Sequence, residues 1–117
     1  MTKELRDKWV EALRSGRYQQ GKGHLHAGEC FCALGVLCDV LGLEWVPCEE
    51  IGDDLNNLPV YMAAGESTDG IPDSISEKIG LEDVDHAAVA IRNDSGDSFT
   101  GIADWIEAHV SVVEAVA

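Results

Sequence analysis

The sequence predicts a mainly α-helical protein, with about five helices packed around a central apolar helix at residues 31–41 and a small β-ribbon or hairpin at most. In several segments the apolar residues recur at spacings of three and four, which is typical of amphipathic helices. Glycine, proline or an N-capping residue bounds most of these segments. A length of 117 residues suits one domain, so we expect residues 1–117 to form a single domain.

The first helix is expected at Lys3–Ser15. Thr2 precedes it as a favoured N-cap, because its hydroxyl can accept a hydrogen bond from a free backbone N–H group. Gly16 follows its last turn, where a residue with left-handed backbone commonly ends a helix. The apolar stripe of this helix, which we expect to face the core, consists of Leu5, Trp9, Val10 and Leu13.

A glycine-punctuated loop connects this helix to the central one. Residues 17–30 contain three glycines among polar and basic residues, which predicts a loop with at most a short hairpin. The central helix is expected at residues 31–41, ending at Gly42, and its nearly all-apolar composition places it in the core. Asp39 is its only charged residue, so we expect this carboxylate to reach the helix surface or to meet a basic partner.

The second half of the chain begins with an irregular region at residues 43–67. Within it, the runs LEWV and LPVYM are expected to pair as a small β-ribbon, and the acidic stretch 48–57 between them is expected to form a loop. A third helix is expected at Pro72–Ile79, because proline is favoured at a helix start and glycine follows at position 80.

Two further helices complete the expected fold. One is predicted at about Val84–Asn93, and the other follows Ser98 and runs to about His109, with apolar residues on one face. The apolar tail 110–117 either extends the last helix or frays. Its apolar residues also make it a candidate edge for pairing with a second copy of the chain.

Composition narrows the classes of function. The net charge of −14 argues against general nucleic-acid binding, which requires neutralisation of phosphates. No run approaches the roughly 18 apolar residues of a membrane span, and the charged start MTKELRDKW does not fit a signal peptide. We therefore expect a cytoplasmic protein whose four cysteines are reduced thiols.

Positive charge is concentrated near the N-terminus. Residues 1–22 hold six of the eight basic residues and three of the 22 acids, a net charge of +3. The remaining two basic residues and 19 acids give residues 23–117 a net charge of −17. Localised positive charge on an acidic protein indicates a site for an anion. The expected ligand-binding residues are Arg14, Arg17, Tyr18, Gln20, Gly21, Lys22, Gly23, His24, Asn93 and Asp94.

Each residue type in this set has a chemical reason to be there. Gly21 and Gly23 would let backbone N–H groups approach a phosphate closely. Tyr18 can stack on a base, and side-chain amides can read polar ligand groups. The alternative is a solvated turn whose basic residues complement the dipole of the first helix, with Asn93 and Asp94 merely ending a helix before the next N-cap.

Several segments resemble one known family. They are KWVEALRSGRYQQGKGHL, FCALGVLCDVLGLEW, IPDSISEKIGL and RNDSGDSFTGIADWIE. Together they resemble a widespread family of small uncharacterised proteins of tailed bacteriophages and prophages. Members usually carry two adjacent cysteines before the LGVLCD segment, whereas this chain has Cys32 followed by Ala33. The resemblance implies an accessory role in a phage, such as countering a host defence, and the missing cysteine argues against vicinal-thiol chemistry.

The sequence also contains residues that could form a cysteine-dependent active site or a metal site. Cys32 near a helix start, with His86 as base, would resemble papain-like amidases and cell-wall endopeptidases. The alanines of HAAVAIRN favour a helix at His86 over the strand those enzymes require. A metal site would use His24, His26, Cys30 and Cys32, but their spacing is not that of zinc ligands. We therefore expect no catalytic residue, no metal and no cofactor.

The functional hypothesis is a phage counter-defence protein that binds and sequesters a small anionic, nucleotide-type signalling ligand without catalysis. The first alternative is an acidic protein that inhibits a host DNA-binding or defence protein by occupying its DNA-binding surface. The second alternative is a small cysteine hydrolase that uses Cys32. The expected partners are thus a small ligand or a host protein, and neither nucleic acid nor a membrane.

Overall fold

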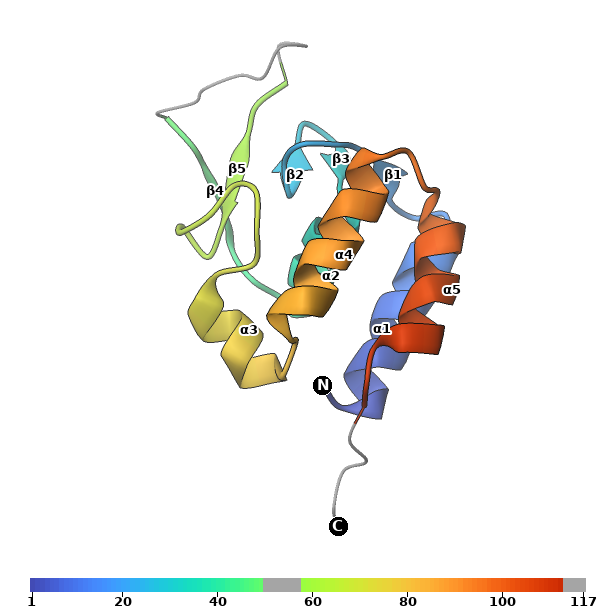
Figure 1. Ribbon diagram of the computed structural model, residues 1–117. Coiled ribbons are helices and arrows are strands. Elements are labelled where there is room, and N and C mark those ends of the chain that lie inside the picture. The colour runs from blue at the N-terminus through green and yellow to red at the C-terminus, as the bar shows by residue number, and fades with distance from the viewer. Residues whose placement is uncertain (50–57, 113–117) are drawn as a thin grey trace.

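The computed structural model describes residues 1–49 and 58–112, which form a mainly α-helical fold (Figure 1). This part of the chain contains five helices, as the sequence predicts, and two small sheets. The predicted acidic loop lies largely outside the described residues, and so does the end of the tail. The helices are α1 (Lys3–Arg14), α2 (Ala33–Val40), α3 (Asp73–Ile79), α4 (Asp83–Asp94) and α5 (Phe99–His109).

Helices α1 and α5 lie side by side, and both bury an apolar face (Figure 1). The predicted N-cap Thr2 is confirmed, because its hydroxyl accepts a hydrogen bond from the backbone N–H of Leu5. Ser98 caps α5 in the same way, by accepting from the backbone N–H of Gly101. Trp9 of α1 is fully buried, and its Nε1 donates to the carbonyl oxygen of Ala33 at 2.9 Å. Trp9 of the predicted apolar stripe therefore contacts the start of α2.

Helix α2 begins at Ala33, two residues later than the sequence predicts. Phe31 pairs in a strand, and Cys32 has extended backbone as the N-cap, its Sγ accepting from the N–H of Gly35 at 3.4 Å. Six of the eight residues of α2 are buried. A Cβ atom at Gly35 would lie 1.8 Å from the carbonyl oxygen of Leu25, so only glycine permits this close approach.

The loop between α1 and α2 contains more structure than a single hairpin. Strands β1 (Gln19–Gln20), β2 (His26–Ala27) and β3 (Cys30–Phe31) form a small sheet in the order β1-β3-β2. The predicted hairpin is the antiparallel pair β2 and β3, and β1 adds to it in parallel. The predicted ribbon is also confirmed, as β4 (Trp45–Pro47) antiparallel to β5 (Tyr61–Ala63).

An aromatic cluster fills the space between the two sheets. The ring of His26 stacks between Phe31 and Tyr61, at centroid distances of 4.0 and 4.5 Å, and meets the edge of Trp45 at 4.8 Å. Burial lowers the pKa of His26 below its ordinary value. These stacked rings join the β1–β3 sheet to the β4–β5 ribbon.

Asp39 is half-buried at the surface of α2, and its hydrogen-bond partners are neutral side chains, not the basic residue that the sequence offers as the alternative. Its carboxylate accepts from the hydroxyl of Tyr18 at 2.6 Å and from Nε1 of Trp45 at 3.1 Å. Burial raises the pKa of Tyr18 to about 12, so this phenol stays a hydrogen-bond donor to the carboxylate. Two neutral donors thus satisfy the single charge of α2.

The remaining boundaries agree with the sequence to within a few residues. Helix α3 ends at Ile79, and Gly80 follows it as the C-cap, with a φ of 74° in the left-handed region. Helix α5 ends at His109, so residues 110–112 do not extend it. Within the described residues, no helix is both long enough and apolar enough to cross a membrane.

Candidate functional site

A buried asparagine ties the glycine-rich loop to two helices. Asn93, on α4, is 1% exposed, and its Oδ1 accepts from Nε2 of Gln20 at 3.0 Å and from the backbone N–H of Ala33 at 3.1 Å. Its Nδ2 donates to the carbonyl oxygen of Gly21 at 2.8 Å. This one side chain therefore holds β1, the next turn of the loop and the start of α2 in fixed positions.

Gln20 extends the same network to the start of α5. Its Nε2 also donates to the carbonyl oxygen of Asp97 at 2.7 Å, and its Oε1 accepts from the N–H of Phe99 at 3.2 Å. The amide groups of Gln20 and Asn93, which the sequence assigns to ligand recognition, are thus engaged within the protein. Their role in this structure is to position the loop.

Beside this network lies a cavity of about 260 Å³, here called the polar cavity. The loop, the start of α2, the turn before α3 and the last turns of α4 border it. Asp94 Oδ1 accepts from the backbone N–H of Gly23 at 3.2 Å, which closes one edge. Its lining residues are Gly23, His24, Cys32, Leu34, Asp69, Ala90, Asn93 and Asp94.

The polar cavity offers hydrogen-bond acceptors. Asp69 and Asp94 contribute carboxylates and His24 an imidazole, whereas no lysine or arginine is among the described residues that line it. Such a lining suits ligand groups that donate hydrogen bonds, such as amino and hydroxyl groups. Asp69 is the residue that sequence reasoning missed, because it lies in the turn STDG and belongs to no recognisable motif.

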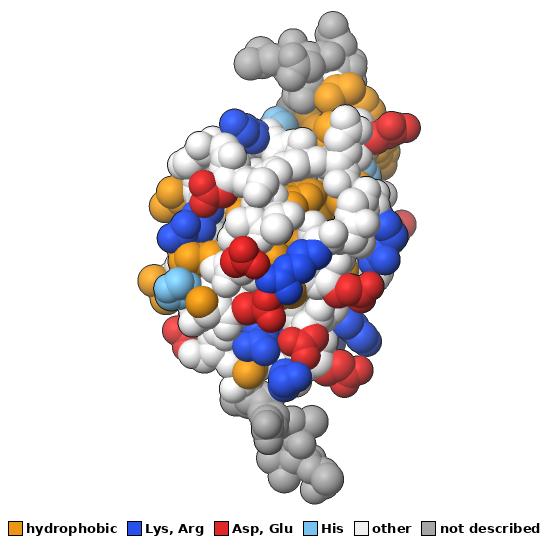
Figure 2. All heavy atoms as spheres, turned by 90° about the vertical axis from the view of Figure 1, so that its right-hand side faces the viewer, with side chains coloured by type: hydrophobic (Ala, Val, Ile, Leu, Met, Phe, Trp, Pro, Cys, Tyr) orange, Lys and Arg blue, Asp and Glu red, His pale blue; other side chains and the backbone are white. Residues whose placement is uncertain are grey.

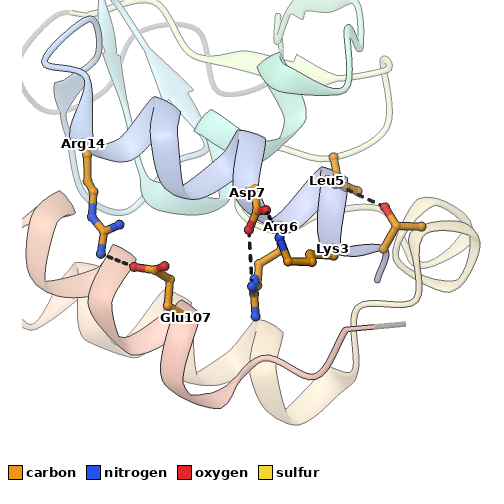
Figure 3. Close-up of polar contacts among 7 residues, drawn as sticks. Lys3, Leu5, Arg6, Asp7, Arg14 and Glu107 are labelled. Atoms are coloured by element: carbon orange, nitrogen blue, oxygen red, sulfur yellow. Dashed lines mark hydrogen bonds and ion pairs between the residues drawn. The ribbon is translucent and has the colours of Figure 1, made fainter. Parts of the chain in front are cut away.

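The basic residues are distributed differently from the expected cluster. Arg14 points from α1 toward α5 (Figure 3), where its Nη2 pairs with Asp104 at 2.6 Å and also with Glu107. Arg17 pairs with Glu11 at 3.7 Å. Neither arginine lines the polar cavity, because α5 and α1 supply acids that face these guanidinium groups.

Ion pairing cancels much of the positive charge that the sequence concentrates near its start. On α1, Asp7 pairs with Lys3 at 2.8 Å and with Arg6 at 3.3 Å, and Glu4 pairs with Lys8 at 3.5 Å. Figure 2 accordingly shows acidic and basic side chains interleaved on the face that α1 and α5 present. Within the described part of the chain, no ion pair forms at Lys22, which precedes Gly23 at the edge of the polar cavity.

The geometry gives little support to a cysteine nucleophile. Burial raises the pKa of Cys32 to about 11, whereas a nucleophilic thiol requires a lowered pKa. His86 Nε2 already accepts from the backbone N–H of Ile71 at 3.0 Å, so this nitrogen faces the turn before α3. The described residues contain no group of three or more His, Cys, Asp or Glu side chains arranged to hold a metal ion.

Comparison with known proteins places the chain in one family. It belongs to the family described as a domain of unknown function, DUF8296, which it matches over residues 1–110. The match includes α1 through α5 and every residue that lines the polar cavity. No curated protein and no solved structure matches the chain. Functional inference therefore rests on the geometry of the site.

Proposed function

We propose that this protein binds a small polar ligand of nucleotide type in the polar cavity and holds it without chemical change. The observation that carries this proposal is the construction of the cavity. The buried amide of Asn93 fixes the loop and the start of α2, while Asp69, Asp94 and His24 border the adjacent open space. A binding site whose walls are already ordered loses little conformational entropy when it captures a ligand.

The charges of the lining define how such a ligand would be oriented. Amino and hydroxyl groups of a base or ribose suit the carboxylates of Asp69 and Asp94. A phosphate suits the ammonium group of Lys22 outside them, since charge-assisted hydrogen bonds are the strong ones. Sequestration of a nucleotide-type signal in this way would counter a host defence, the role that the resemblance to phage proteins implies.

The test is retention of candidate ligands by the purified protein. The protein is incubated with adenosine, AMP, ADP-ribose and cyclic di-AMP, freed of unbound compound by filtration and denatured by heat, and the released compounds are identified by mass spectrometry. We expect one phosphorylated compound to be retained and released unchanged. Retention of no compound, or release of an altered compound, would contradict the proposal.

Matched variants assign the binding to the cavity. Asp94→Asn and Lys22→Gln should each weaken binding about tenfold or more, the usual effect of losing a charge-assisted hydrogen bond. Glu77→Gln, on the exposed surface of α3, removes one charge elsewhere and should leave binding unchanged. Equal binding by all three variants would exclude the polar cavity as the site.

A second candidate function is inhibition of a host DNA-binding or defence protein. Val84 and Ile91 are 68% and 65% exposed, and they are the exposed large hydrophobic residues of the described chain. They lie seven positions apart on α4, so they share one face of that helix. Acids stand at both ends of this strip, including Asp83 and Asp94. An apolar strip with acids at both ends suits a partner surface that carries basic residues.

Salt dependence and a double variant test this candidate. DNA-binding proteins captured from a bacterial lysate at low salt should dissociate at high salt, because exposed charges are screened. Val84→Ser combined with Ile91→Ser should abolish the capture, whereas Ala108→Ser on the exposed face of α5 should not. Capture that the double variant leaves intact would count against the α4 strip.

A further inference from the structure

A second cavity, here called the apolar pocket, is separate from the polar cavity and differs from it in chemistry. It has a volume of about 360 Å³, within the range of small-molecule sites at roughly 300–1,000 Å³. The N-terminal end of α1, the segment after α2 and helix α3 surround it, at the end of the molecule where the chain begins (Figure 1). Its aliphatic lining residues are Leu5, Leu41, Leu43, Ile75 and Ile79.

These aliphatic side chains are only partly covered by the protein. All five are half-buried, and each packs against the buried core. Covering such an apolar surface with a ligand is favourable, because it removes the surface from water. Helix α3 contributes to the pocket with Ile75 and Ile79, one helical turn apart, so both reach the same space.

The polar groups at the pocket determine the sign of the charge that it favours. Thr2 and Lys78 complete the lining, and no carboxylate is among the described lining residues, although the chain carries 22 acids. The ammonium group of Lys78 is exposed, and the ion pairs of the described residues do not include it. An unpaired cation beside an aliphatic surface complements an amphipathic anion.

We propose that the apolar pocket binds a small carboxylate with a short aliphatic chain. The aliphatic chain would lie among the leucine and isoleucine side chains, and the carboxylate would pair with Nζ of Lys78. Lys78 supplies a positive charge to the lining, and no described lining side chain supplies a negative one. A carboxylate head group can therefore pair with this ammonium group through a charge-assisted hydrogen bond.

The test is titration of the full-length, isotope-labelled protein with octanoate below its micelle concentration. Amide and methyl resonances of Leu5, Ile75 and Ile79 should shift together. Octylammonium has the same chain and the opposite charge, so it should bind at least about tenfold more weakly. Affinity should rise about fourfold per added methylene from butanoate to octanoate, the effect of burying one more CH₂ group. Equal affinity for octanoate and octylammonium would overturn the proposal.

Variants separate the two parts of the proposed site. Lys78→Met should reduce the affinity for octanoate to that for octanol. The control Lys8→Met removes a charge on the exposed surface of α1, outside the pocket lining, and should leave the affinity for octanoate unchanged. Ile75→Trp should fill the pocket and weaken the binding of octanoate, octylammonium and octanol. Unchanged octanoate binding by Lys78→Met contradicts the carboxylate assignment, even if the tryptophan variant does not fold. A dimer, detected by light scattering, that shields these methyl groups from octanoate would also overturn the proposal.

Discussion

The two cavities of this protein are built in opposite ways. The polar cavity is bordered by backbone and side chains that Asn93 and Gln20 hold through directional hydrogen bonds, so a displaced wall would leave buried polar groups unpaired. The walls of the apolar pocket are aliphatic side chains of three separate segments, held by non-directional packing. The polar cavity is therefore fixed by specific hydrogen-bond partners, whereas the side chains around the apolar pocket can adjust their positions.

The largest effect is expected from Gly35→Ala, in α2 directly after Leu34, which lines the polar cavity. A Cβ atom at this position would overlap the carbonyl oxygen of Leu25, at 1.8 Å, and the backbone there cannot rotate away as a side chain could. We expect a loss of at least about 3 kcal/mol in the free energy of unfolding, the upper part of the range for overpacking. Urea denaturation followed by circular dichroism measures it, with Gly101→Ala on the exposed side of α5 as the control. A loss below about 1 kcal/mol would show that α2 can move away from Leu25.

Asn93→Ala should have the next largest effect. The substitution leaves the N–H of Ala33, the carbonyl of Gly21 and one amide contact of Gln20 without their partner. We expect a loss of about 2–3 kcal/mol, since each buried polar group left unsatisfied costs roughly 1–3 kcal/mol and some regain water. Hydrogen exchange should show faster exchange of the loop amides than of those in α1 and α5. Uniform exchange across all three regions would mean that the network does not hold the loop in particular.

Ile75→Ala tests the other side of the comparison and should have a smaller effect. Ile75 is half-buried, so we expect a loss of about 1 kcal/mol, below the roughly 2–5 kcal/mol of a fully buried site. Ile102→Ala, at a residue that is 0% exposed, is the matched control and should reach that range. Thermal or urea unfolding of both variants provides the comparison. Equal losses would show that the apolar pocket is as tightly packed as the core.

The smallest effect concerns pH and His86, which contacts the turn that carries Asp69. Burial lowers the pKa of His86 below its ordinary value of 6.5, although Asp83, Asp73 and Asp69 act in the opposite direction. As pH falls, His86 takes up a proton more readily in the unfolded chain than in the folded protein. The contribution of neutral His86 to the stability of the fold is therefore complete above pH 6.5 and is lost as pH falls through the pKa of the folded protein. Protonation of Nε2 would also remove the acceptor for the N–H of Ile71. His86→Gln keeps an acceptor and does not titrate.

Urea midpoints at neutral and mildly acidic pH measure this contribution. The decrease in midpoint on acidification should be smaller in His86→Gln than in the unaltered protein, because the carboxylates titrate alike in both. His109→Gln, at an exposed position at the end of α5, should behave like the unaltered protein. An identical decrease in all three proteins would show that protonation of His86 does not contribute to the loss of stability at acidic pH.

The helices could be predicted from the sequence because their signals are local. Thr2, Gly16 and Gly80 act on residues within one turn, and the spacing of apolar residues repeats along each helix. The start of α2 was misplaced by two residues because Phe31 pairs with β1 and β2, and no local signal favours a strand of two residues. The sequence also grouped His24, Asn93 and Asp94, which line one cavity in the structure. Polar residues in loops and at helix ends are frequent in binding sites, which is why this grouping could be predicted.

What the sequence alone determined is therefore the order, type and approximate bounds of the helices, together with the acidic character of the protein. Only the tertiary structure decided which partners the polar and charged groups meet. Asn93 reaches partners 72 and 73 positions away, and Arg14 reaches an acid 90 positions away on α5. Helix propensity and capping depend on residues a few positions apart, whereas the lining of a cavity depends on how the finished helices pack. Most of the basic residues that cluster near the start of the chain are therefore paired with acids, Lys22 excepted among the described residues, and carboxylates line the polar cavity.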